Sequence, residues 1–162
     1  MATAAARSAR AYFILNRPSD LRVNSYIMIK ALVCGRGMHG IITEFLERHL
    51  DQQSDIEVYD HCSPQEMPAR AEEEEPDVVL LVVGIPSHND LINVAEVHER
   101  FPFSPIIAVS MALDDRFPID PLLDAGVTRL VVGDETLDLD LIIREVVAEA
   151  RAEHSAELAT AR

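Results

Sequence analysis

The chain has 162 residues, of which 48% are hydrophobic, and a formal net charge of -14 at pH 7. This length suits one domain whose core needs neither metals nor disulfides. No apolar run is long enough to span a bilayer, and the acidic charge argues against direct binding of nucleic acid, which needs a basic face. Two cysteines, Cys34 and Cys62, cannot form a disulfide framework, so we expect a reducing, cytoplasmic compartment.

Residues 1–27 differ in composition from the rest of the chain. They hold four arginines and a single acid, and the first ten residues are mostly Ala, Ser and Arg. Such a segment resembles an organelle transit peptide, but we favour a disordered tail or an over-long start, because Met28 opens directly onto a strand. We therefore expect a tail over residues 1–27, one domain over residues 28–152 and a frayed C-terminal end over residues 153–162.

Five apolar segments are predicted to be β-strands. The third, DVVLLVVGIP, is an unbroken apolar run with no alternation, which is typical of a central strand buried on both faces of a parallel sheet. In chain order the five segments are Ile29–Cys34, Ile56–Tyr59, Asp77–Pro86, Pro105–Ser110 and Thr128–Val132.

Helical patterns separate these strands. Met38–Leu50 carries apolar residues at a spacing of three and four. Ser63–Glu66 and Ser87–Asp90 both have the form of a capping box, so each is predicted to begin a helix, the first with Pro64 at its first position.

The last two helices are predicted from turn residues and periodicity. Asp120 and Pro121 start a short helix that stops at Gly126. Thr136 is predicted to cap the final helix, with Leu137 on its apolar side. Five strands that alternate with five helices predict a doubly wound α/β domain, with either the flavodoxin-like strand order 2-1-3-4-5 or a Rossmann order.

The segment Pro76–Val147 closely resembles the receiver domain of bacterial response regulators. The resemblance rests on PDVVLLVVGIP, then ERFPFSPIIAVSMALDD, then DAGVTRLVVGDETLDLDLIIREVV, and it extends more weakly back to Ile29. It implies a CheY-like, flavodoxin-like sheet of order 2-1-3-4-5. It also implies a role in two-component signal transduction, with a sensor kinase or another signalling protein as partner.

Receivers are phosphorylated on an aspartate at the end of the third strand, with two acids holding Mg²⁺ and a lysine that neutralises the phosphoryl oxygens. In this chain the aspartate position falls at Val82. The next residue is Val83, so shifting the alignment by one residue supplies no nucleophile either. The acidic pair falls at Cys34 and Gly35. The lysine position falls at Gly133, and the switching hydroxyl is kept at Ser110. The resemblance therefore implies a pseudo-receiver that does not depend on phosphorylation.

Receivers dock partners, and many dimerise, through their fourth helix, fifth strand and fifth helix. The resemblance places that surface at Asp115–Asp124, Arg129–Val132 and the exposed side of Leu137–Ala150, where contact with a protein partner or homodimerisation is expected. No catalytic triad, nucleophile elbow or paired carboxylates can be identified, so we expect no enzymatic activity.

A glycine-rich loop gives a competing interpretation. Residues 35–40 read G-x-G-x-x-G between a strand and a helix, and Asp60 lies where an acid would meet a ribose hydroxyl. Gly35, Arg36, Gly37 and Gly40 would then surround a nucleotide phosphate at a helix N-terminus. MIKALVCGRGMHGIITEFLERHL also resembles the start of many NAD-dependent dehydrogenases, but no catalytic domain follows. A tight turn without a ligand is the alternative that we favour.

Two smaller candidates remain open. Cys34 and Cys62 end neighbouring strands, so they are either small core residues or a redox pair. His39, His61 and His88 lie in loops at strand ends, but their spacing matches no metal motif, so we expect no metal site.

Overall fold

The computed structural model describes residues 28–35, 40–110 and 119–161. The predicted tail over residues 1–27 lies outside these ranges. Five parallel strands form one sheet in the order β2-β1-β3-β4-β5. This order confirms the flavodoxin-like prediction, excludes the Rossmann order and places β3 at the centre. The strands are β1 (Ile29–Cys34), β2 (Ile56–Cys62), β3 (Val78–Val82), β4 (Ile106–Ser110) and β5 (Arg129–Val132).

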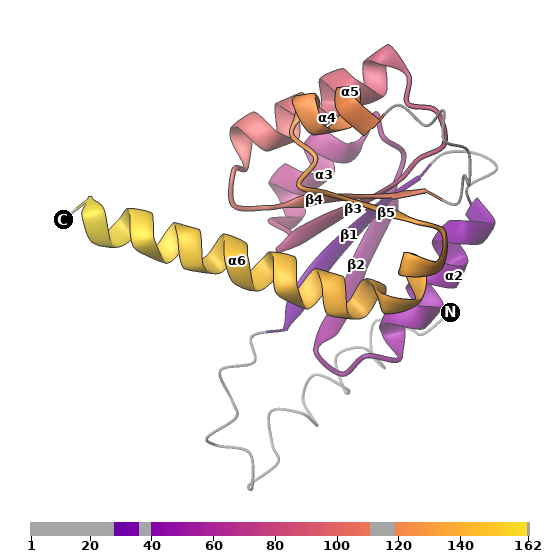
Figure 1. Ribbon diagram of the computed structural model, residues 1–162, viewed down its shortest axis with the longest axis horizontal. Coiled ribbons are helices and arrows are strands. Elements are labelled where there is room, and N and C mark those ends of the chain that lie inside the picture. The colour runs from indigo at the N-terminus through magenta and orange to yellow at the C-terminus, as the bar shows by residue number, and fades with distance from the viewer. Residues whose placement is uncertain (1–27, 36–39, 111–118, 162) are drawn as a thin grey trace, which may run out of the picture.

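Helices cover both faces of the sheet (Figure 1). One face packs against α2 (Gly40–Asp51) and α6 (Leu139–Thr160), and the other packs against α3 (Met67–Glu74), α4 (His88–Arg100) and α5 (Ile119–Ala125). A short 3₁₀ helix, η2 (Gly133–Asp138), joins β5 to α6. Because side chains alternate along a strand, each central strand contributes to both core layers.

A β-bulge separates the two halves of the β1–β2 pairing. Ala31 pairs with Val58, but the next residue, Leu32, pairs with Asp60, so Tyr59 is the extra residue. The Tyr59 ring is half-exposed, and Nζ of Lys30 lies 4.6 Å from its centre. Past the bulge, β2 continues to Cys62, three residues beyond the predicted end.

Only one of the two predicted capping boxes opens a helix. At α4, Oγ of Ser87 accepts from the Asp90 amide at 3.1 Å, and Oδ2 of Asp90 accepts from the Ser87 amide at 2.8 Å. At residues 63–66 the prediction is wrong. The Glu66 carboxylate accepts from the Ser63 amide at 3.0 Å, but this contact closes a turn, and α3 begins one residue after Glu66.

The C-terminal predictions also need correction. Thr136 does not cap α6; it is buried within η2, where its hydroxyl donates to the carbonyl of Gly133 at 2.7 Å, and α6 begins at Leu139. Leu137 is exposed, because the 3₁₀ turn places it outside the apolar stripe of α6. The chain is helical from residue 153 to Thr160, where a frayed end was expected, since this stretch is rich in Ala and Glu, which favour helices.

Arg144 ties α6 to the segment that enters β2. Its Nε and one terminal nitrogen donate to the two Asp55 oxygens at 2.8 and 2.9 Å, and its other terminal nitrogen donates to Asp140 at 2.9 Å. These hydrogen bonds hold the pKa of Asp55 below its usual value. For Asp140, burial raises the pKa, but hydrogen bonds from Arg144 and His49 and the charge of Arg144 lower it by more.

We expect Arg144→Met to lower the free energy of unfolding by about 1–2 kcal/mol at pH 7, because it removes a bidentate, half-buried ion pair. Arg70→Met is the matched control: it removes an exposed ion pair with Glu73 and should cost less than about 0.5 kcal/mol. Denaturant unfolding of both variants measures these costs. Equal costs would contradict the role given to Arg144.

The same pair predicts a pH dependence. The pKa of Asp55 is lower in the folded state than in the unfolded chain. The ionised Asp55 therefore stabilises the folded state at pH values above its unfolded pKa of about 4, and this stabilisation is lost as the pH falls from there toward the folded-state pKa. The stability difference between wild type and Arg144→Met should therefore shrink between pH 6 and pH 3, values chosen to bracket that pKa of about 4. A difference that stays constant over this range would contradict the assignment.

Gly126 ends α5 with a φ of 114°, which side-chain-bearing residues rarely adopt. A methyl group here would also collide with Cγ of His98 and lie 2.6 Å from its Cβ. We expect Gly126→Ala to cost about 2–4 kcal/mol in an unfolding experiment, from backbone strain and overpacking together. Adding His98→Ala should recover only part of this loss, because the Cβ and the strain remain. Full recovery would show that backbone strain contributes nothing.

Candidate functional site

The strand ends bring the receiver-like positions to one edge of the sheet. Parallel strands end at the same edge, and the pairings align these ends: Val82 lies beside Val109, and Ser110 lies beside Val132. Cys34 ends β1, and Gly133 directly follows β5. The structure thus gathers Cys34, Gly35, Val82, Ser110 and Gly133 at the carboxyl edge, as the resemblance implies.

This edge is closed by buried side chains. Cys34 is fully buried, and Val82 and Ser110 are 2% and 1% exposed. Val82 belongs to the core layer under α2 and α6, whereas Cys34 belongs to the opposite layer. The amide of Val83 donates to the carbonyl of Val109, so the sheet pairing continues one residue past β3. None of the five receiver-like positions carries a carboxylate.

Acids that flank this edge have structural roles. Asp90 is buried and closes the capping box at the start of α4. The Glu135 carboxylate accepts from the Val132 amide at 3.3 Å, directly after β5. Lys30, the only lysine in the sequence, lies at the opposite end of β1, where its ammonium donates to the carbonyl of Glu74 at 3.0 Å.

The glycine-rich loop has the predicted strand-to-helix context. β1 ends at Cys34 and α2 begins at Gly40, while Arg36, Gly37 and His39 lie outside the described residues. The amide of Gly35 donates to the carbonyl of Cys62 at 3.0 Å. β1 lies between β2 and β3, so the loop starts where the strand order reverses direction, the point at which doubly wound sheets bind ligands.

The two cysteines approach each other as their strand positions suggest. Cys34 and Cys62 are direct partners across β1 and β2, and their Sγ atoms lie 3.0 Å apart. Neither cysteine is in a disulfide, and both are buried.

Of the three histidines, His39 lies outside the described residues, and the other two sit apart from any group of metal-binding side chains. Nδ1 of His61 lies 3.2 Å from a carboxylate oxygen of Glu47, and His88 is exposed at the start of α4. Across residues 28–35, 40–110 and 119–161, no three His, Cys, Asp or Glu side chains are grouped so that they could hold a metal ion.

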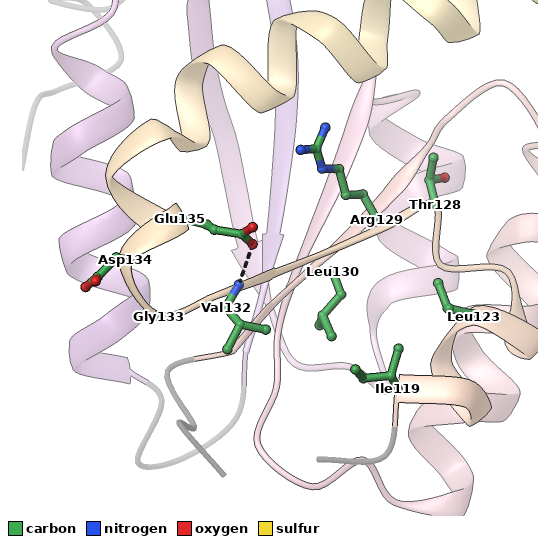
Figure 2. A pocket seen from close by; sticks show the side chains of 9 residues that line it. All are labelled: Ile119, Leu123, Thr128, Arg129, Leu130, Val132, Gly133, Asp134 and Glu135. Atoms are coloured by element: carbon green, nitrogen blue, oxygen red, sulfur yellow. Dashed lines mark hydrogen bonds between the residues drawn. The ribbon is translucent and has the colours of Figure 1, made fainter. Parts of the chain in front are cut away.

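A pocket of about 730 Å³ lies between α5, β5 and η2 and reaches Gly133 at the carboxyl edge (Figure 2). Ile119 and Leu123 of α5 and Leu130 of β5 form its apolar wall, and Asp134 and Glu135 of η2 bound the other side. The resemblance placed the first three within the expected docking surface. It missed the two η2 acids, because the sequence gives no sign that a 3₁₀ turn follows β5.

Comparisons with known proteins support the fold. No family model matches the sequence, and neither does any curated protein. Among solved structures, the signal receiver domain of an HD domain-containing protein from Pseudomonas fluorescens is similar with a TM-score of 0.66 and 16% identity, covering 80% of this chain and 93% of that one. A CheY-like receiver domain protein from Methanospirillum hungatei has a TM-score of 0.62 and 18% identity, covering 78% and 98%.

The response regulator domain of Thermotoga maritima CheB is also similar, with a TM-score of 0.54 and 21% identity, covering 77% of this chain and 95% of that one. These likenesses confirm the CheY-like α/β fold. Within the described residues, no helix combines the length and apolar character needed to cross a membrane.

Proposed function

We propose that this chain is a pseudo-receiver: a signalling domain with the receiver fold that acts by protein contact and accepts no phosphoryl group. The observation that carries the proposal is Val82, which ends the central strand with 2% of its surface exposed. The likeness of the fold to receiver domains supports the signalling role.

The chemistry of the edge supports independence from phosphorylation. Covalent phosphotransfer needs a carboxylate nucleophile, and Mg²⁺ needs oxygen ligands. Val82 has an isopropyl side chain, which cannot act as the nucleophile. At the two positions where receivers hold Mg²⁺, Cys34 has a buried thiol and Gly35 has no side chain, so neither supplies an oxygen ligand. The lysine that would neutralise a phosphoryl group is replaced by Gly133, and Lys30 is held at the far end of β1.

We expect no phosphoryl adduct when the full chain is incubated with acetyl phosphate and Mg²⁺ and its intact mass is measured. A receiver domain that keeps its aspartate serves as the positive control in the same buffer. An adduct mapped to an acid near this edge, such as Asp60 or Asp134, would overturn the phosphorylation-independent reading.

The pocket between α5, β5 and η2 is the proposed contact surface. Ile119 and Leu123 are each 45% exposed, and beyond the pocket Leu137 and Leu141 are 65% and 58% exposed. Apolar side chains gathered on one surface favour protein contact. The acids at the pocket edge favour a partner that presents an apolar side chain beside a basic one. A signalling protein such as a sensor kinase, or a second copy of this chain, would fill this role.

Self-association through this surface is tested by sedimentation velocity over a range of concentrations. We expect a dimer whose dissociation constant rises at least tenfold with Leu123→Arg, since a charge buried in the interface costs more than the ~1.4 kcal/mol that a tenfold change in Kd represents. Leu158→Arg is the matched control, because Leu158 is 57% exposed near the end of α6 and should leave the dimer unchanged. An equal effect of both changes, or a wild-type chain that stays monomeric, would contradict homodimerisation through this surface.

The alternative function is a nucleotide sensor that uses the glycine-rich loop. The favouring observation is that Gly35 directly follows β1, at the reversal of strand order, and α2 begins at Gly40. Glycines there would let the backbone approach a phosphate at the N-terminus of α2.

A thermal-shift titration with NAD(H), NADP(H), ATP, GTP and cyclic dinucleotides tests this alternative. A ligand at a hundred times its Kd stabilises the folded state by about 2.7 kcal/mol. Gly37→Ala should abolish such a shift, and Gly84→Ala, at another strand end without a positive φ, should preserve it. We expect no shift with any of these ligands. A saturable shift that only Gly37→Ala removes would favour the sensor.

A further inference from the structure

The bulge at Tyr59 determines which residue of β2 faces Cys34. Before the bulge, residues of β1 pair with residues 27 positions later, as Ala31 does with Val58; after it the offset is 28, as for Cys34 and Cys62. If the offset of 27 residues continued past Tyr59, Cys34 would lie opposite His61. The extra residue therefore brings the only two cysteines of the chain into register.

The two thiols also share one face of the sheet. Both belong to the core layer under α3, α4 and α5, and their Sγ atoms lie 3.0 Å apart. Neighbouring strands are separated by about 4.8 Å, which falls within the range of about 4.4–6.8 Å between Cα atoms that a disulfide spans. The bond can therefore form without separating the strands.

We propose that Cys34 and Cys62 are a reversible redox pair, which a peroxide oxidises to an intramolecular disulfide and a dithiol reduces. Cys62 is the residue that meets the oxidant first. It is 6% exposed at the end of β2, an edge strand, whereas Cys34 is fully buried in β1. Local opening is easiest at such a strand end.

The reaction balances in two steps. The Cys62 thiol loses its proton, the thiolate attacks one peroxide oxygen, and the O–O bond breaks; a sulfenic acid forms, and the leaving hydroxide takes up that proton to become water. The Cys34 thiol then attacks the Cys62 sulfur, the S–O bond breaks, and a disulfide forms as water leaves. In total, two thiols and one hydrogen peroxide give one disulfide and two waters, with the two electrons passing from sulfur to oxygen.

The disulfide would fix the carboxyl ends of β1 and β2. Gly35 lies next to Cys34, and its amide already donates to the carbonyl of Cys62. Oxidation would thus add a covalent link beside this hydrogen bond, at the start of the glycine-rich loop. Disulfides that form in a reducing compartment are usually transient and serve catalysis or redox sensing.

The test uses the full chain, whose thiols can all be assigned because it has two cysteines. Reduced protein is treated with hydrogen peroxide, unfolded in guanidinium and alkylated with a maleimide. Intact mass and non-reducing electrophoresis follow. We expect two maleimide adducts before oxidation; after it we expect none, with the loss of two hydrogens, a monomeric band and recovery of both adducts with dithiothreitol.

Thermal unfolding of the oxidised and reduced chain supplies a second measurement that needs no variant. Closing the loop between Cys34 and Cys62 should raise the Tm by about 5–10 °C. Cys62→Ser should abolish both this rise and the loss of two hydrogens. Two thiols that survive the oxidant, a disulfide between two chains, or oxidation to sulfinic acid without a disulfide would overturn the proposal.

Discussion

The structure depends on the burial of three central strands from both sides. Every residue of β3 and β4 is buried, and β1 is buried except at Lys30. Each strand sends alternate side chains into two separate core layers, one under α2 and α6 and the other under α3, α4 and α5. An ionised group in such a strand would carry a large desolvation cost unless it were paired. Apolar residues therefore fill these strands to their last positions.

This constraint accounts for the character of the carboxyl edge. Val82 and Cys34 extend the two core layers up to the point where β3 and β1 end, and Val83 continues the sheet pairing beyond β3. Receiver chemistry needs carboxylates at such positions. A carboxylate there is stable only if a metal ion or a lysine beside it offsets the cost of burying its charge. In this chain Cys34 and Val82, both core residues, occupy the ends of β1 and β3. The contact surface that we propose is therefore the outer surface around the pocket beside α5 and β5.

The sequence predicted the elements whose patterns are local. The apolar run at residues 77–86 predicted the buried central strand, and Ser87 with Asp90 predicted the start of α4, because a capping box needs only four neighbouring residues. The strand order required the receiver resemblance, since periodicity alone allowed two topologies. The same capping pattern failed at Ser63, where the Glu66 side chain closes a turn instead of a helix.

Features set by contacts between distant segments were not predictable in the same way. The bulge at Tyr59 sets the register of Cys34 and Cys62, but it arises from pairing with β1 and cannot be recognised in the local residue pattern. Arg144 reads as a surface residue of α6, yet it binds Asp55, which lies 89 positions earlier. The closeness of the cysteines was foreseen only as a possibility, because it depends on a one-residue shift.

The most direct test of the central claim is a Mg²⁺ titration of the ¹⁵N-labelled chain, followed by two-dimensional NMR. We expect that the amide signals of Cys34, Val82 and Ser110 do not move at millimolar Mg²⁺, because none of the five receiver-like positions carries a carboxylate. Saturable shifts of these three signals would show a metal site at the carboxyl edge and contradict the assignment as a pseudo-receiver.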